Sequence, residues 1–290
     1  MDAQFGTTSA DYCVHSDELR ITPHDGYATR TKTVADMLRI AFSEFERPFP
    51  NSFRLVVHST DKAPELLPTN ASNEVHACCT VRTDTSRVIP VPDYIFMNWE
   101  EVGIFDYDEM CLEITQSSRR PVQVPKAFWI GAATTNRWRQ RLLEIAKENP
   151  DLIEAIGMQW HRLPGETRSR PAGVFKSLPD HCDYRYLIDI EGYGYSGRLK
   201  MLFFSGRPVF VQDRSDVEYW HGGLVPFVNF IPVAQDLSDL VEKIEWANRN
   251  SSQCAEIAAN AMKFAETSLT RSAAIRFLVS QLRRYLIQGG

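Results

Sequence analysis

The sequence predicts an α/β protein, and three observations lead to this prediction. From residue 184 onward, short strand-like runs alternate with helical segments, an order typical of a parallel sheet covered by helices. In the first sixty residues, a helical segment is followed closely by a strand-like run. The chain has 290 residues, enough for two ordinary domains. We therefore expect two α/β domains rather than one.

The first part of the chain shows one clear helix and one clear strand. Residues 31–46 form an amphipathic helix with Thr31 or Thr33 as its cap. Its apolar face comprises Val34, Met37, Leu38, Ala41, Phe42 and Phe45. The segment "ERPFPN" ends this helix, and "FRLVVHS" (53–59) follows as a β-branched strand. Residues 66–126 are irregular, rich in proline and aromatic residues, and contain short strand-like runs.

The second part alternates more regularly. A helix over 136–156, broken at Asn149-Pro150, precedes a polar stretch (161–173) that we expect to be a surface loop. The further expected elements are strand 184–190, a helix from Ser196, strand 208–212, a helical turn in 216–223, strand 227–233 and helices 236–250, 251–268 and 271–288. This alternation predicts a parallel, doubly wound sheet.

Composition excludes several classes of function. The formal net charge of -5 gives no general attraction to nucleic acid or to an anionic membrane surface. The N-terminus has neither the basic flank nor the apolar core of a secretory signal, and no run of about 18 apolar residues occurs. The six cysteines include no Cys-x-x-Cys pair, which favours reduced thiols over a disulfide framework. We therefore expect a cytoplasmic protein without a membrane span.

The stretch "YRYLIDIEGYGYSGRLKMLFFSG" (184–206) has the pattern of a phosphate site. A buried strand runs into a glycine-rich loop and then a helix start that carries Ser196 and Arg198. A hydroxyl, a guanidinium and free backbone N–H groups together suit a diphosphate. Two other interpretations are open. The G-x-G-x-x-G spacing, with Asp213 after the next strand, also occurs in nicotinamide-dependent oxidoreductases, although there it usually opens the first βα unit. The loop could also be a helix start that binds nothing.

The same region resembles glycosyltransferase family 90, the protein O-glucosyltransferase and capsule-associated xylosyltransferase family. The similar features are the His181-Cys182 start, the Ser-x-Arg helix start, Glu218 before an aromatic pair, and "IPV" followed by "DLS". Upstream, "VPDYIFMNWEE" is similar to the Trp-Glu segment of the family, and "PKAFWIGAATTNRWRQR" to its aromatic-x-Gly-x-x-Thr loop. "VVHSTDKAPE" resembles the strand end that carries an Asp shortly before a Pro. The resemblance runs from about Gly26 to Thr270 and is densest in the last third.

The resemblance implies an inverting transferase of GT-B architecture, with two Rossmann-like domains facing across a cleft. Residues 1–125 would form the acceptor-side domain and residues 126–270 the domain that binds a UDP-sugar. The C-terminal helix, 271–290, would pack back on the first domain. The implied reaction moves a sugar, with xylose favoured and glucose next, from UDP to a hydroxyl of a glycan acceptor and forms a β-linkage. UDP-xylose or UDP-glucose would be the donor, and no cofactor would be permanently bound.

Matching the family's motifs residue by residue implies a set of site residues. Asp61 would be the catalytic base, with Glu100 as the alternative, and Trp99 and Glu100 would bind substrate. The donor would be held by Gly131, Thr134, Arg137, Tyr193, Gly194, Tyr195, Ser196, Gly197, Arg198 and Glu218. Some relatives carry Arg where this chain has Ile130, so its phosphate or sugar contact would be either lost or supplied by Arg137 or Arg139. The sequence shows neither the leader nor the retention tail of secretory members, which favours a glycan acceptor over a folded protein domain.

Two alternatives compete with this interpretation. Asp106-x-Asp108 matches the D-x-D pattern by which metal-dependent transferases hold Mn²⁺, and paired carboxylates suit a divalent cation. However, D-x-D is short and follows no clear strand, so we expect a solvated acidic loop and no metal. The second alternative is a non-catalytic relative that binds nucleotide sugars or glycans. The presence of both Asp61 and Arg198 argues against it.

Overall fold

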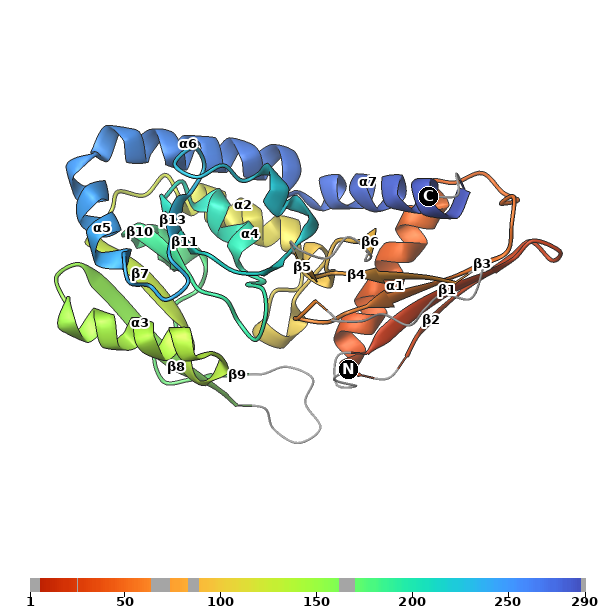
Figure 1. The fold of residues 1–290 in the computed structure, drawn as a ribbon, viewed down its shortest axis with the longest axis horizontal. Coiled ribbons are helices and arrows are strands. Elements are labelled where there is room, and N and C mark those ends of the chain that lie inside the picture. Colours follow the sequence, from red (N-terminus) through yellow and green to blue (C-terminus); the bar gives the residue numbers. More distant parts are fainter. Residues whose placement is uncertain (1–5, 25, 64–73, 83–88, 162–169, 288–290) are drawn as a thin grey trace. The chain divides into compact units, whose positions relative to one another are not determined.

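The computed structural model describes residues 6–24, 26–63, 74–82, 89–161 and 170–287. The chain divides into two compact units (Figure 1). The first unit comprises residues 1–107, 215–221 and 270–290, and the second comprises residues 108–214 and 222–269. The chain thus leaves the first unit at Tyr107, earlier than the boundary expected at residue 125. Most of the stretch expected to be a surface loop, 161–173, lies outside the described residues.

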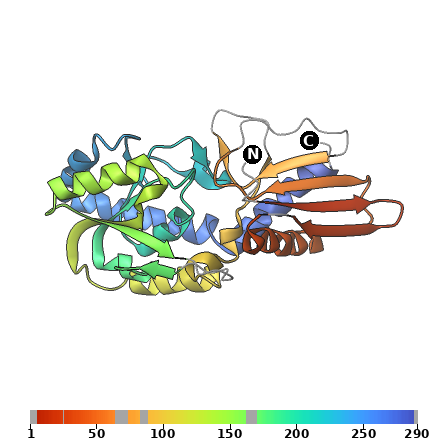
Figure 2. The same ribbon diagram turned by 90° about the horizontal axis from the view of Figure 1, so that it is seen from below.

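The first unit is built on a five-stranded mixed sheet in the order β2-β1-β3-β4-β6. Figure 2 shows its long strands side by side. β1 is antiparallel to β2 and β3, whereas β3, β4 and β6 run parallel. The helices α1 and α7 pack against each other. The elements of this unit are β1 (Thr7–Cys13), β2 (Glu18–Pro23), α1 (Ala28–Ser43), β3 (Phe53–His58), β4 (Glu74–Cys78), β5 (Val81–Arg82), β6 (Ile89–Pro90), β12 (Asp216–Val217) and α7 (Arg271–Leu282).

Helix α1 has the predicted buried face but a different start. Val34, Met37, Leu38, Ala41 and Phe42 are buried, as the periodicity predicts. The predicted threonine caps are wrong, because the helix begins three residues earlier and its N-cap residue, Tyr27, makes no side-chain capping bond. The Thr33 hydroxyl instead donates to the Thr29 carbonyl one turn back, at 2.8 Å. Threonines inside a helix commonly bond in this way.

The hairpin of β1 and β2 has no counterpart in the sequence prediction. Its strands pair in antiparallel register from Thr8–Pro23 to Cys13–Glu18. The alternation of apolar and polar residues is weak in β2, because this strand lies at the sheet edge and its residues are half-buried or exposed. Polar edge strands carry little hydrophobic signal, which explains why this hairpin was missed.

The second unit contains the predicted parallel sheet, which confirms the α/β fold class. Its strand order is β13-β11-β10-β7-β8-β9, and all pairs are parallel except the edge pair of β8 and β9. Helices α3 and α5 and the start of α6 bury one face of the sheet around Trp129 and Ile188. The elements are α2 (Tyr107–Ser117), β7 (Val124–Ala132), α3 (Arg137–Glu148), β8 (Ile153–His161), β9 (Arg170–Ala172), β10 (Tyr184–Asp189), α4 (Leu199–Leu202), β11 (Val209–Gln212), β13 (Ile231–Val233), α5 (Leu240–Arg249) and α6 (Ser251–Ser268).

Two predictions about strands in this unit are wrong. Residues 153–156 do not continue the helix after Asn149-Pro150 but begin β8, whose residues 153–158 pair with β7. A short apolar run fits either structure by periodicity, and here pairing in the sheet decides it. The strand expected at 227–233 is reduced to β13, because Phe227 has a positive φ of 59°, which breaks extended backbone.

Within the described residues, no helix combines the length and apolar character that spanning a membrane requires.

Candidate functional site

The second unit has a topological switch point at which a ligand site is expected. Numbered along the chain, the parallel strands β7, β8, β10, β11 and β13 lie in the spatial order 2-1-3-4-5. The order therefore reverses between β7 and β10. In open α/β sheets, ligands bind beyond the carboxyl ends of the two strands at this point. Gly131 is the next-to-last residue of β7 and Thr134 follows the strand, whereas residues 193–198 follow β10.

Hydrogen bonds join the two segments that flank the switch point. The Asn136 amide donates to the Glu191 carboxylate at 2.9 Å and to the Gly192 carbonyl at 3.1 Å. Arg139 Nε donates to the Glu191 carbonyl at 2.8 Å, and its terminal nitrogens donate to the Ala132 and Ile190 carbonyls. Arg139 therefore holds backbone in place, and burial lowers its pKa to about 9. Neither Asn136 nor Glu191 was predicted.

Two glycines are required by close approach at this edge. A Cβ at Gly131 would lie 2.8 Å from Cζ2 of the Trp129 ring, which is closer than real contacts allow. A Cβ at Gly192 would lie 3.0 Å from the Tyr195 carbonyl oxygen, to which the Gly192 N–H already donates. The glycines therefore permit the tight packing of the loop against the sheet.

A buried carboxylate organises the residues beneath the loop. Asp189, the last residue of β10, is fully buried. It accepts a hydrogen bond from the Ser196 hydroxyl at 2.6 Å and one from Arg214 Nη2 at 2.6 Å. Arg198 Nε lies 3.8 Å from the same carboxylate. The predicted residues Ser196 and Arg198 thus meet two residues, Asp189 and Arg214, that sequence reasoning did not identify.

Arg198 combines burial with unused donors. Its Nη1 donates to the Ile130 carbonyl, and its guanidinium lies 5.6 Å from the Trp129 ring centroid. Within the described residues, its Nε and Nη2 donate no hydrogen bond. Burial lowers the pKa of Arg198, yet a guanidinium stays protonated in proteins at neutral pH. A buried cation with open donors is suited to binding an anion.

The helix after the loop is shorter than predicted. The residues from Ser196 lead into α4, a single turn over Leu199–Leu202, which continues as a 3₁₀ turn. The helix dipole arises from many aligned peptide units, so this turn contributes little to anion binding. Charge at this site comes mainly from arginine side chains.

The other residues predicted to bind the UDP-sugar differ in how exposed they are. Tyr195 is buried beside Lys200, whose ammonium lies 5.5 Å from the ring centroid, whereas Tyr193 is 42% exposed. Thr134 and Arg137 are exposed, and the Arg137 guanidinium stacks 4.2 Å from the Trp138 ring centroid. Gly194 is buried and Gly197 half-buried. Glu218 is buried but folds with the first unit, where its backbone N–H donates to His221.

Asp61 lies in a compact charge cluster of the first unit. It follows β3, as predicted, and accepts a hydrogen bond from Arg30 Nη1 at 2.7 Å. Arg30 Nε lies 3.7 Å from Glu101, and its guanidinium lies 4.8 Å from the Tyr94 ring centroid. Burial raises the pKa of Asp61, and Arg30 partly offsets this rise. A carboxylate of this kind is a stronger base than an ordinary one.

The predicted substrate residues Trp99 and Glu100 lie in a short loop of the same unit. Trp99 forms a β-bridge with Ile104, with backbone bonds of 2.7 and 3.1 Å. The turn is closed by Gly103, whose φ is 84°. Both Trp99 and Glu100 are half-buried. Glu101, rather than Glu100, reaches the cluster around Arg30, a contact that the sequence pattern could not indicate.

The D-x-D residues have other roles. Asp106 forms an ion pair with Arg271 Nη2 at 2.8 Å, and Asp108 is in the first turn of α2. An acidic residue in the first turn is favoured by the helix dipole. Within the described ranges, no group of three or more His, Cys, Asp or Glu residues is placed to hold a metal ion.

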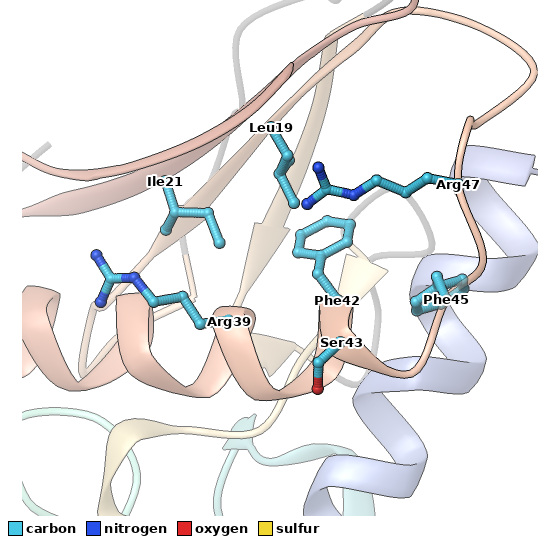
Figure 3. Close-up of a pocket in the computed structure, with 7 residues that line it drawn as sticks. All are labelled: Leu19, Ile21, Arg39, Phe42, Ser43, Phe45 and Arg47. Atoms are coloured by element: carbon cyan, nitrogen blue, oxygen red, sulfur yellow. The ribbon is translucent and has the colours of Figure 1, made fainter. Parts of the chain in front are cut away.

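A pocket of about 400 Å³ lies elsewhere in the first unit. Figure 3 shows its lining from β2, the end of α1 and the following residues, including Leu19, Phe42 and Arg47. Arg39, which also lines this pocket, forms an ion pair with Asp36 at 2.5 Å. None of the predicted site residues lines it.

Comparison with known proteins shows that this chain is similar in sequence to protein O-glucosyltransferases and to a viral protein. The chain is 33% identical to Protein O-glucosyltransferase 1 of Rattus norvegicus over 141 residues, covering 48% of this chain and 36% of the relative. It is 28% identical to Protein O-glucosyltransferase 2 of Danio rerio over 196 residues (67% and 39%). It is also 28% identical to Uncharacterized protein 035R of Invertebrate iridescent virus 3 over 184 residues (56% and 16%). The chain thus spans well under half the length of these relatives.

Solved structures show similarity at a lower level. Anabaena Alr3699/HepE in complex with UDP-glucose matches with a TM-score of 0.39 and 13% identity, over 60% of this chain and 44% of that chain. TarM matches with a TM-score of 0.43 and 11% identity, over 74% and 51%. The model of glycosyl transferase family 90 matches residues 67–286. This match spans most of the chain and confirms the resemblance seen in the sequence: the chain belongs to glycosyl transferase family 90.

Proposed function

We propose that the protein is an inverting glycosyltransferase that moves a sugar from a UDP-sugar to a hydroxyl of a glycan acceptor, forming a β-linkage. The observation that carries this proposal is the cationic site at the switch point, where Arg198 has open donors beside the ends of β7 and β10. Family membership supports the reaction class. UDP-xylose is the first donor to test and UDP-glucose the second, the latter favoured by the names of the relatives.

The proposed chemistry needs two functions from this chain. The diphosphate of the leaving UDP carries negative charge, and preorganised cationic donors stabilise such charge as it develops. We assign this to Arg198, with the residues 193–198 and Gly131, Thr134 and Arg137 surrounding the donor. Inversion in a single displacement also needs a base for the acceptor hydroxyl, which we assign to Asp61. The second unit would thus bind the donor, and the first would supply the base.

The reaction is tested by following UDP release and product formation with UDP-xylose and UDP-glucose. Wild-type protein should release UDP slowly into water and faster with a glycan acceptor, and NMR of the product should show inversion at C1. A relative that only binds nucleotide sugars would bind UDP without releasing it from either donor, which would contradict the proposal. The cytoplasmic location stays a prediction.

The role of Asp61 gives a first specific prediction. Asp61→Asn should keep the fold and bind UDP normally but lose transfer by at least about 100-fold, because general-base catalysis contributes about 10²- to 10⁴-fold. Glu100→Gln tests the alternative base and should lose less transfer than Asp61→Asn. Near wild-type transfer by Asp61→Asn together with an inactive Glu100→Gln would show that Glu100 is the base.

A further inference from the structure

The carboxylate of Asp189 lies near two arginines, Arg214 and Arg198, but forms a hydrogen bond with only one of them. Arg214 Nη2 is 2.6 Å from one carboxylate oxygen, whereas Arg198 Nε is 3.8 Å from the other. The first distance is that of a charge-assisted hydrogen bond, and the second is too long for any hydrogen bond. Asp189 is therefore paired with Arg214, while Arg198 lies beside the carboxylate without bonding to it.

Arg214 is held firmly in this arrangement. Its side chain is 2% exposed. Its Nε donates to the Gln212 carbonyl at 3.1 Å, and its Nη2 also approaches the Asp189 carbonyl oxygen at 3.3 Å. Within the described residues its Nη1 is buried and donates no hydrogen bond, but the bonds of Nε and Nη2 tie the guanidinium to Gln212 and to Asp189. Arg198, with a side chain that is 15% exposed, is the more accessible of the two.

Of the two arginines beside Asp189, Arg198 has the more exposed side chain, so an anion would meet it before Arg214. Arg139 is engaged with backbone carbonyls, and Glu191 accepts from Asn136. His181 is buried nearby, and burial lowers its pKa to about 3, so it is neutral and adds no charge. A lone buried carboxylate strongly attracts the nearest cation, and without Arg214 that cation would be Arg198.

We propose that Arg214 is a positioning residue that occupies the Asp189 carboxylate and thereby keeps the Arg198 guanidinium available for the diphosphate of the donor. This rests on the proposed function, since it assigns the anion to a UDP-sugar. Neither residue needs to touch the ligand. Without Arg214, Asp189 would bond to Arg198, whose N–H groups would then no longer be available to the diphosphate. Without Asp189 as well, no carboxylate would compete with the diphosphate for Arg198.

The proposal is tested by measuring the affinities of UDP and uridine by calorimetry. Arg214→Met should weaken UDP binding by at least about tenfold, because a charge-assisted contact is lost, while uridine affinity changes less than about twofold. The double variant Asp189→Asn/Arg214→Met should regain UDP affinity to within about threefold of wild type. Its amide at position 189 still accepts from Ser196, and the variant leaves neither partner of the ion pair buried alone.

The double variant also decides the question if Arg214→Met does not fold. UDP affinity near wild type in the double variant supports the proposal, whereas UDP binding weaker by more than about threefold overturns it, because Arg214 would then contact the diphosphate directly. Unchanged UDP affinity in a folded Arg214→Met protein also overturns it. Wild-type protein that binds UDP no better than uridine would instead refute the proposed function itself.

Arg207→Met serves as a control for merely structural effects. Its guanidinium donates only to backbone carbonyls among the described residues, including those of Cys182 and Ser118. Its loss should lower the melting temperature but leave the ratio of UDP to uridine affinity unchanged. The recovery on adding Asp189→Asn is a result that a structural role of Arg214 does not produce.

Discussion

At the scale of single residues, sequence motifs singled out Asp61 and Arg198 but not the charged residues that surround them. Asp61 and Arg198 were found because each stands in a short motif next to a strand or glycine loop. Arg30, which pairs with Asp61, and Asp189, the buried carboxylate beside Arg198, carry no motif. The contact between Arg30 and Asp61 joins residues 31 apart in the chain. Such pairs depend on how strands and helices pack, which no local pattern encodes. The sequence could therefore propose Asp61 and Arg198 as site residues, but it could not indicate the charged groups around them.

The Arg30–Asp61 pair predicts a specific pH dependence. Burial and the nearby Asp93 and Glu101 raise the pKa of Asp61, whereas Arg30 lowers it, with Tyr94 packed against the pair. Removing Arg30 raises the pKa further, so Asp61 becomes protonated and inactive at a higher pH. The acidic limb of the kcat/KM profile of Arg30→Met should therefore move to higher pH, with activity recovering in alkaline buffer.

The matched control is Arg39→Met on the same helix, because Arg39 pairs with the exposed Asp36. This variant should keep the wild-type profile. A uniform loss of activity at every pH in Arg30→Met, with the acidic limb in place, would show that Arg30 does not act through the charge of Asp61.

At the scale of helices and strands, the prediction succeeded where hydrophobic pattern and burial agree. The strand expected at 184–190 is β10, all buried except Arg185, and the helix face of α1 is as predicted. The misses share a physical cause. β8 was taken for helix because short apolar runs are ambiguous, and β2 was missed because an edge strand needs no apolar face. The helix from Ser196 is one turn because Gly206, with a φ of 62°, closes the segment soon afterwards.

His181, in the segment that leads into β10, should make the stability of the protein depend on pH. His181 is buried there, with Nδ1 bonded to the Ser177 carbonyl and its ring edge-on to Phe128. Burial lowers its pKa from 6.5 to about 3. Between these values the unfolded chain binds a proton that the folded protein does not, so stability is full above pH 6.5 and falls below it. The expected contribution is about 1.4 kcal/mol per pH unit.

This dependence can be measured by urea unfolding at pH 7, 6 and 5. His181→Gln should be less stable than wild type at pH 7 but should lose less free energy of unfolding on acidification. His161→Gln, at the exposed end of β8, should follow the wild-type curve. An equally steep decline in His181→Gln would exclude His181 as the source.

At the scale of the whole molecule, the sequence predicted two α/β domains with the last helix packing on the first, but it did not indicate that residues 215–221 return to the first unit. Residues 215–221 return to the first unit, where β12 pairs with β5, and the last helix also belongs there. These are contacts between segments more than a hundred residues apart, such as Ala63 N–H with Asp216 at 3.0 Å. Amphipathic patterns show that a segment needs a partner, but they do not identify the partner.

We expect that sugar transfer does not depend on a divalent cation. The diphosphate charge is assigned to Arg198, and Asp106 is already paired with Arg271. Activity should therefore survive EDTA with less than about a twofold loss, and Asp106→Ala combined with Asp108→Ala should be mild. Complete loss in EDTA that Mn²⁺ restores would favour the acidic pair.

The most direct test of the central claim is the affinity of UDP for Arg198→Ala, measured by calorimetry beside the wild-type protein. A charge-assisted contact to phosphate contributes about 1.5 to 3 kcal/mol, so we predict UDP binding weaker by about 10- to 100-fold. Ser196→Ala, which removes a neutral hydroxyl, should lose about 1 kcal/mol or less. Wild-type UDP affinity in Arg198→Ala would contradict the account, because the diphosphate would then bind elsewhere than at the switch point between β7 and β10.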